Sequence, residues 1–536
     1  MCMKYNMGTK NEFGTSVHWF RKGMRLHDNP AFKLAYESKN SNGEYYKLKP
    51  IYILDPYFRK YIRAGMNRWR FLQQSLVDLD LSLRKLGTRL YIIRGIPEEV
   101  FPDLFVKWNV KLLTFELDTE PYARKRDEQV ENLARQHGVK VDQKVSHTIY
   151  NTELVIRANM GKVPMTYQKF VSVVGSMPPP RRPLPAPDKL PLECLLDDDL
   201  KNHEFDVPTV DELLTLKGFN PQDLKSCLYP GGEKEALRRL EECMKNKSWV
   251  CKFEKPNTSP NSLKPSTTVL SPYMKFGCLS ASHFYYRLIE TIGNSSHSKP
   301  PVSLIGQLYW REFYYTVGAA TPNFDKMAGN SICCQVPWDD NPELLEAWTN
   351  GKTGYPFIDA IMRQLRHEGW IHHLARHAVA CFLTRGDLWI SWEKGLAVFE
   401  ELLLDADWSM NAGNWMWLSA SAFFHQFFRV YSPVAFGKKT DKSGDYIRKY
   451  IPELTKYPDQ YIYEPWLAPK ALQERAGCMI GIHYPKRVVI HEDVYKNNIT
   501  KMSLAYKNNK AGKSPTKNSG DTLTPDKKVV KKAKFK

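Results

Sequence analysis

The sequence predicts an α/β domain followed by an all-α domain, and two features of the chain support this. Up to about residue 146, short apolar runs typical of buried strands alternate with segments whose apolar residues recur at helical spacing. From about residue 212 onward the patterns are helical, and no strand-like alternation is found. Between them lie seven prolines from Pro178 to Pro191, which cannot be helix interior and predict an extended linker.

The first domain is expected to be a Rossmann-like, doubly wound parallel sheet. Its predicted strands are residues 16–20, 50–56, 89–95, 111–117 and 139–146, and the helices between them are residues 67–86, 97–108 and 121–137. Short links between alternating strands and helices favour parallel strands with helices on both faces. The domain contains no GxGxxG, which argues against a nicotinamide-type dinucleotide site.

These patterns divide the chain into five segments. We expect a disordered start at residues 1–14, the α/β domain at 15–148, the linker at 149–211, the helical domain at 212–506 and a disordered basic tail at 507–536. The tail carries ten lysines and two acids. Its last residues, KKVVKKAKFK, suggest either a nuclear address or an arm that touches DNA, so we expect a nuclear protein.

The composition is that of an ordinary globular protein with a strong basic excess. The 77 Lys and Arg against 58 Asp and Glu give a formal net charge of +19, which favours an anionic partner such as nucleic acid. A basic tail alone also inflates that count. The 10 Cys include no CxxC pair, which indicates reduced thiols in an intracellular protein. No apolar run approaches the roughly 20 residues of a membrane span, so we expect no membrane partner.

One stretch of the helical domain, residues 351–439, is rich in side chains that a simple core does not need. It holds six tryptophans together with histidines and acids in an otherwise apolar run. A core is filled more simply by Leu and Val, which carry no N–H that needs a partner. The stretch therefore predicts a buried, chemically active pocket that holds an aromatic group.

A metal site was the main competing interpretation of this stretch. His373 and His377 stand at i and i+4, on one helical face, as in the zinc motif HExxH. The residue after His373 is Leu374 rather than Glu, and no further cluster of ligands supports a metal. We therefore expect no metal.

The acid–base residues allow more than one interpretation. An Arg376–Asp405 pair would form an internal clamp, with Asp405 and Asp407 expected on a different helix from Arg376. The two histidines could supply a proton near neutral pH or could be ordinary core histidines. The hydroxyls of Thr267, Thr268 and Ser271 at a helix start could grip a phosphate or serve only as a helix cap.

The chain resembles the photolyase/cryptochrome family, and most closely the animal (6-4) photolyases. The resemblance covers about residues 16 to 505 and rests on long motifs in the family order. These motifs are HWFRKGMRLHDNP, TTVLSPYMKFGCLS, GQLYWREFYY, GKTGYPFIDAIMRQL, WIHHLARH and DADWSMNAGNWMW. The family fold, an α/β antenna-type domain joined by a long linker to a helical FAD-binding domain, agrees with the predicted architecture.

The resemblance implies a reduced FAD cofactor and a set of residues that hold it. The implied cofactor residues are Thr267, Thr268, Val269, Leu270, Ser271, Gln307, Arg311, His373, Arg376, Asp405, Asp407 and Asn411. Among them, Asp407 would bond the isoalloxazine or ribityl edge, and Asn411 would face flavin N5. An electron-hopping chain would comprise Trp415, Trp392, Trp338 and Trp389, the last on the surface side. An antenna chromophore, either a deazaflavin or a folate, is left open.

The resemblance also implies a function, the light-driven repair of (6-4) photoproducts in ultraviolet-damaged duplex DNA by a monomeric lyase. His373 would be the general acid, with His377 hydrogen-bonded to it. The implied DNA-contacting residues are Gln307, Trp310, Arg429, Tyr431, Lys438 and Lys439. WIHHLARH is shared with vertebrate-type cryptochromes, so a flavin photoreceptor or circadian transcriptional regulator is the alternative. A helical metal hydrolase that binds DNA is a third.

Overall fold

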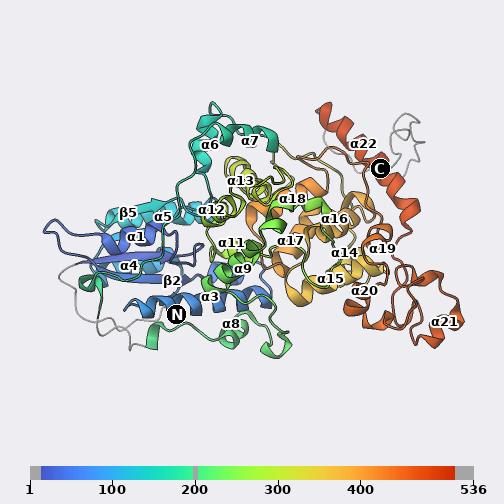
Figure 1. The fold of residues 1–536 in the computed structure, drawn as a ribbon, viewed down its shortest axis with the longest axis horizontal. Helices are drawn as coiled ribbons and strands as arrows, with labels where there is room; N and C mark the ends of the chain where they lie inside the picture. Colours follow the sequence, from blue (N-terminus) through green and yellow to red (C-terminus); the bar gives the residue numbers. More distant parts are fainter. Residues whose placement is uncertain (1–13, 197–202, 513–536) are drawn as a thin grey trace. The chain divides into compact units, whose positions relative to one another are not determined.

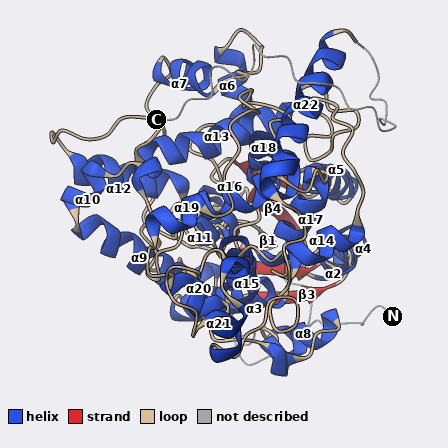
Figure 2. Cartoon of the chain, turned by 90° about the vertical axis from the view of Figure 1, so that its right-hand side faces the viewer, coloured by secondary structure: helices blue, strands red, loops and turns tan. Residues whose placement is uncertain are grey.

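The computed structural model describes residues 14–196 and 203–512, and it confirms the predicted fold class: one parallel sheet and many helices (Figure 2). The chain forms two compact units. Among the described residues, unit 1 comprises those up to Lys255 with Thr268–Ala319 and Leu404–Asp407. Unit 2 comprises Pro256–Thr267, Ala320–Leu403 and those from Trp408 onward. The bounds of the five predicted segments stay predictions.

The sheet belongs to unit 1 and has five parallel strands in the order β3-β2-β1-β4-β5. They are β1 (Thr15–Phe20), β2 (Lys47–Leu54), β3 (Tyr91–Arg94), β4 (Val110–Glu116) and β5 (Lys140–Lys144). β2 begins three residues earlier than predicted, because Lys47–Lys49 pair with Thr15–Val17 of β1. Lys49 fits there because its ammonium lies 4.4 Å from the ring centroid of Tyr91 and 4.7 Å from that of Trp108.

Alternation along β1 separates the two faces of the sheet. Trp19 packs on Phe101 of α4 (Pro97–Lys107), with ring centroids 4.9 Å apart, and α5 (Pro121–Gln136) joins the same core. Phe20 points to the opposite face and meets Phe32 of α1 (Pro30–Glu37), with centroids 5.6 Å apart. Helices therefore cover both faces, as a doubly wound sheet requires (Figure 1).

The strand order reverses between β1 and β4, and the carboxyl ends of these strands carry charged residues. Lys22 Nζ lies 3.1 Å from Asp118 and 2.6 Å from Glu120, and Arg25 lies 3.3 Å from Glu116. Sheets of this class bind their ligands at such a reversal. Here the position holds the chain's own ion pairs.

The other helices of unit 1 follow the sheet along the chain. The segment predicted as linker contains α6 (Thr152–Ala158), α7 (Tyr167–Gly175) and short 3₁₀ turns, while its proline stretch after Pro178 has no regular structure. The remaining α-helices of this unit are α2 (Pro56–Lys60), α3 (Met66–Lys85), α8 (Val210–Lys217), α9 (Glu233–Lys245), α10 (Lys247–Lys252), α11 (Ser271–Phe276), α12 (Ala281–Ile292) and α13 (Leu304–Ala320).

Unit 2 is helical throughout its described part. Its elements are α14 (Pro342–Thr349), α15 (Pro356–Glu368), α16 (His373–Cys381), the π-turn η6 (Phe382–Gly386), α17 (Trp392–Leu402), α18 (Trp408–Leu418), α19 (Ala435–Thr440), α20 (Asp445–Tyr450), α21 (Lys470–Arg475) and α22 (His491–Lys510). α22 continues past the predicted end of the domain at residue 506. The predicted disordered start and the lysine-rich end of the tail lie at 1–13 and 513–536, outside the described residues.

Candidate functional site

The loop before α11 carries the residues predicted to hold a diphosphate. Val269 has φ +51°, in the left-handed region that a β-branched residue rarely adopts. Ser266 Oγ is buried and has no hydrogen-bond partner among the residues that the structure describes. Thr267 and Thr268 are half-buried beside it, and Leu270 is buried. The unpaired Ser266 hydroxyl can donate to a phosphate oxygen, and strained backbone is typical of loops that bind ligands. These residues therefore fit the diphosphate of FAD.

The two predicted aspartates lie in the connection between α17 and α18, so the expectation that they sit on a helix is wrong. α17 ends because Leu403 takes an extended conformation, and helical structure resumes only at Trp408. Asp405 Oδ2 accepts a 2.6 Å hydrogen bond from the Ser271 hydroxyl. Asp407 accepts a short hydrogen bond from the Tyr315 hydroxyl of α13. Both carboxylates are thus fixed by hydroxyl groups from other segments of unit 1.

Helix α13 carries the predicted Gln307, Trp310 and Arg311. Gln307 Nε2 donates to the Pro301 carbonyl at 3.0 Å, and Trp310 stacks on Tyr167 of α7 with ring centroids 4.0 Å apart. Arg311 is buried and pairs at 3.0 Å with the neighbouring Glu312. Contacts with other residues of unit 1 therefore fix all three side chains.

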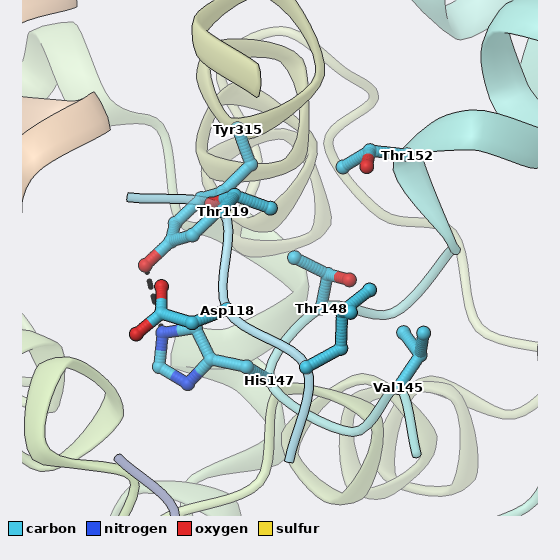
Figure 3. A pocket seen from close by; sticks show the side chains of 8 residues that line it. Asp118, Thr119, Val145, His147, Thr148, Thr152 and Tyr315 are labelled. Carbon is cyan, nitrogen blue, oxygen red and sulfur yellow. Dashed lines mark hydrogen bonds between the residues drawn. The ribbon is translucent and has the colours of Figure 1, made fainter. Parts of the chain in front are cut away.

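The Tyr315 hydroxyl contacts a second residue besides Asp407, and sequence analysis did not identify it. His147 Nε2 lies 2.7 Å from the Tyr315 oxygen, and both side chains line a small hollow of about 10 Å³ (Figure 3). Segments that follow β4 and β5 line this hollow together with α6 and α13. The available signal was a histidine placed directly after a predicted strand, at the sheet edge where ligands bind.

The three histidines of WIHHLARH lie at the start of α16 in unit 2. His372 caps the helix, because its Nδ1 accepts from the backbone N–H of Leu374 at 3.1 Å. His373 and His377 lie on one helical face as predicted, with ring centroids 6.2 Å apart. The Tyr431 hydroxyl lies 3.2 Å from His377 Nδ1. Both predicted histidines are half-buried, so they can meet a group beyond the helix.

Arg376 and Asn411 make hydrogen bonds inside unit 2. Arg376 Nε donates to the Ile371 carbonyl at 3.0 Å, and Asn411 Nδ2 donates to the Leu396 carbonyl at 3.2 Å. The bond of Asn411 ties α18 to α17. The predicted pair of Arg376 with Asp405 joins residues of different units and stays a prediction.

The four predicted electron-transfer tryptophans all lie in unit 2 and are buried. Trp415 packs on Phe399 with centroids 4.9 Å apart, at a crossing of α17 and α18 that only Gly395 permits: a Cβ there would lie 2.2 Å from the Trp415 ring. Trp338 and Trp389 lie with ring centroids 4.8 Å apart. Among the described residues, the indole N–H groups of Trp338, Trp392 and Trp415 have no hydrogen-bond partner.

Trp389 was expected on the surface side, but its side chain is only 3% exposed, so that expectation is wrong. Its backbone has φ +55° and its N–H donates to Thr384 of the π-turn, which turns the ring inward. Its indole N–H donates to the Pro337 carbonyl at 3.0 Å. The ammonium of Lys501 on α22 lies 5.0 Å from its ring centroid.

Four of the six residues predicted to contact DNA, Arg429, Tyr431, Lys438 and Lys439, lie close together in sequence in unit 2. Arg429, Lys438 and Lys439 are exposed, and Lys438 lies 3.3 Å from Glu464. Tyr431 is half-buried and contacts His377 instead of presenting its ring to solvent. Arg429, Lys438 and Lys439 are together termed the basic face.

Within residues 14–196 and 203–512, no three His, Cys, Asp or Glu side chains gather as metal ligands. No helix in those ranges combines the length and the apolar character that crossing a membrane requires.

Comparison with known proteins covers almost the whole chain. The pattern of the FAD-binding domain of DNA photolyase matches residues 304–504, and that of DNA photolyase matches residues 16–188. Cryptochrome-2 of Gallus gallus is 52% identical over 92% of this chain and 84% of its own length. Cryptochrome-1 of Macaca fascicularis is 52% identical over 92% and 83%.

Solved structures agree in fold. A class III photolyase of Agrobacterium tumefaciens aligns with a TM-score of 0.78 at 26% identity, over 94% of this chain and all of that protein. A cryptochrome of Synechocystis sp. PCC6803 aligns with a TM-score of 0.79 at 25% identity, over 92% of this chain and all of that protein.

The cryptochrome relatives overturn one expectation. Proteins that share half of the residues over nearly the full length are cryptochromes, which contradicts the prediction that this chain is a (6-4) repair lyase. One motif behind the prediction, WIHHLARH, is shared with vertebrate-type cryptochromes and therefore does not separate the two branches of the family. With the lyase activity, the role of His373 as a general acid for repair also falls away.

The sheet, the helical unit, the strained hydroxyl-bearing loop and the sequence matches agree with one another. The chain binds FAD and belongs to the photolyase/cryptochrome family.

Proposed function

We propose that this protein is a flavin photoreceptor of the cryptochrome type, which signals through a change in its binding to partners. The observation that carries the proposal is 52% identity with animal cryptochromes over 92% of the chain. Bound FAD supplies the absorption of blue light and accepts an electron. The protein's own part is to hold the cofactor, supply that electron and transmit the change.

The residues predicted to hold FAD keep that role in the proposal. Thr267, Thr268 and the backbone of Val269 and Leu270 take the diphosphate, supported by the strained loop and the buried hydroxyl of Ser266. Asp407 takes the isoalloxazine or ribityl edge. Gln307, Arg311, Arg376, Asp405 and Asn411 complete the set, as in the resemblance.

Trp415, Trp392, Trp338 and Trp389 are proposed to supply the electron. Indoles are oxidisable, and all four of these rings are buried. The 4.8 Å approach of Trp338 and Trp389 supports passage between the last two rings.

The basic face around Arg429, Lys438 and Lys439 is proposed to bind DNA as a surface contact. Replacing both lysines with Gln should lower the salt dependence of DNA binding by about one unit of slope for each lost phosphate contact. Lys234→Gln is the matched control, since Lys234 is an exposed lysine of unit 1. An unchanged slope in the double variant would remove this face from the proposal. Nuclear localisation and a monomeric state remain part of it.

The test of the function uses the purified full chain with its bound FAD. Blue light without added reductant should change the flavin absorption, and the change should alter binding to a partner captured from nuclear extract. A flavin that responds to light with no change in partner binding contradicts the signalling role. Partner binding that is equal in darkness and light would indicate a light-independent transcriptional regulator instead.

A further inference from the structure

Four buried titratable side chains of unit 1 form a string, and only Asp407 among them has a predicted role. Glu116 ends β4, His147 follows β5, Tyr315 lies on α13 and Asp407 precedes α18. Their exposed fractions are 7%, 7%, 1% and 4%. Buried polar groups are costly unless they are bonded, so the chemistry of such a string must be accounted for group by group.

The hydrogen of the Tyr315 hydroxyl is committed to Asp407 Oδ2. The phenol oxygen can then only accept from His147 Nε2, 2.7 Å away, so we assign the imidazole hydrogen to Nε2. On the other side of the ring, Nδ1 lies 3.8 Å from Glu116 Oε2, which is too long for a hydrogen bond. That distance agrees with an Nδ1 that carries no hydrogen. The donors therefore run in one direction, from His147 to Tyr315 to Asp407.

The surroundings keep the string in this state. Burial, reinforced by the cations Arg311, Lys22, Arg25 and Lys275, holds the pKa of His147 well below its usual range, so the ring is neutral. Burial and the nearby Asp407 raise the pKa of Tyr315, so the phenol keeps its hydrogen.

The neighbours also fix the string in position. The Arg311 guanidinium lies 4.5 Å from the Tyr315 ring centroid. Glu312 accepts from the backbone N–H of Ile149 at 2.8 Å, which ties α13 to the segment that carries His147. Both ends of the Tyr315–His147 contact are therefore anchored.

We propose that Tyr315 and His147 are positioning residues for FAD: their one-way string of donors fixes the Asp407 side chain as an acceptor for the flavin. This inference rests on the proposed function, in which Asp407 meets the isoalloxazine or ribityl edge. Successive donors that point the same way polarise one another, so the carboxylate gains more than one isolated bond would give. A cofactor N–H or O–H then meets an acceptor of fixed direction.

The experiment measures FAD release from the purified holoprotein by the recovery of flavin fluorescence on dilution. Tyr315→Phe removes only the hydroxyl and should speed release by about tenfold to a hundredfold, the range for a hydrogen bond to a charged group. Tyr273→Phe is the matched control, because that buried hydroxyl donates to the Pro230 carbonyl at 2.8 Å. The control should release FAD at the wild-type rate.

His147 gives a second, independent pair of variants. His147→Gln keeps an N–H that can reach the phenol and should stay close to wild type. His147→Leu removes the donor and should speed release by about twofold to tenfold. If Tyr315→Phe does not fold, this pair alone decides the proposal, since equal release from the two His147 variants overturns it.

The two His147 variants separate this role from a loss of packing, because Gln and Leu are of similar size and only Gln offers an N–H to the phenol. A wild-type rate in Tyr315→Phe would overturn the inference alone, whereas a wild-type chain that takes up no FAD would overturn the proposed function.

Discussion

The buried polar string of unit 1 and the tryptophan cluster of unit 2, formed by Trp415, Trp392, Trp338 and Trp389, use their hydrogen-bond donors in different ways. In the string, the hydrogens of His147 and Tyr315 are assigned and both point toward Asp407. Among the described residues, three of the four cluster indoles leave their N–H without a hydrogen-bond partner. A fixed proton arrangement suits the orientation of a carboxylate. An apolar set of oxidisable rings suits the movement of an electron.

The largest effect is expected from Trp392, which is fully buried at the start of α17. Trp392→Phe should abolish the light-driven change in flavin absorption measured without added reductant, because Phe is not oxidised under these conditions. The loss of stability should stay below about 3 kcal/mol, because most of the ring volume is kept. Flavin absorbance under continuous blue light and thermal unfolding measure the two effects.

Trp348→Phe is the control for that experiment. Trp348 is equally buried, and its ring centroid lies 6.2 Å from that of Trp415. Its indole N–H, however, donates to the Val379 carbonyl at 3.0 Å. Its replacement should cost about 1 kcal/mol for the lost hydrogen bond and leave the light response intact. A light response lost equally in both variants would mean that the cluster acts only as packing.

The second prediction concerns the pH dependence of stability, which should arise from the buried polar groups of unit 1 and not from the tryptophan cluster. Burial raises the pKa of Glu312 to about 7 against the opposing pull of Arg311. The folded state therefore binds a proton that the unfolded state has released, and stability falls as pH rises from about 4.5 through about 7, by up to about 3 kcal/mol. Glu312→Gln should flatten this part of the curve in denaturant unfolding. A slope that survives the substitution would assign the pH dependence to other groups.

The smallest effect is expected where a cation meets the cluster. The Lys501 ammonium lies over the Trp389 ring and 3.5 Å from the Asp339 carboxylate. Lys501→Gln should cost about 0.5–1 kcal/mol of stability. It should also make the light response faster, because a positive charge disfavours removal of an electron from the ring. Lys496→Gln on the same helix, whose ammonium lies over Tyr495 instead, is the control. A slower response in Lys501→Gln would contradict the electrostatic account.

The two regions also differ in how far the sequence could predict them. The cluster was found because tryptophans crowd one stretch of chain, and its helices follow from apolar spacing. The string joins residues 116, 147, 315 and 407, which share no local pattern, and only the folded chain brings them together. Asp405 and Asp407 were placed on a helix because nothing in their spacing marks the loop that holds them. Motifs around the cofactor identified the family but not its branch, since WIHHLARH serves both.

The most direct test of the account is a search for an oxidised tryptophan after a blue-light pulse to the FAD-loaded protein, by transient absorption and electron spin resonance. The account predicts a tryptophan radical at Trp389 in the wild type, and in Trp338→Phe a radical confined to Trp392 or Trp415. Flavin that responds to light while no tryptophan is oxidised in either protein would contradict it.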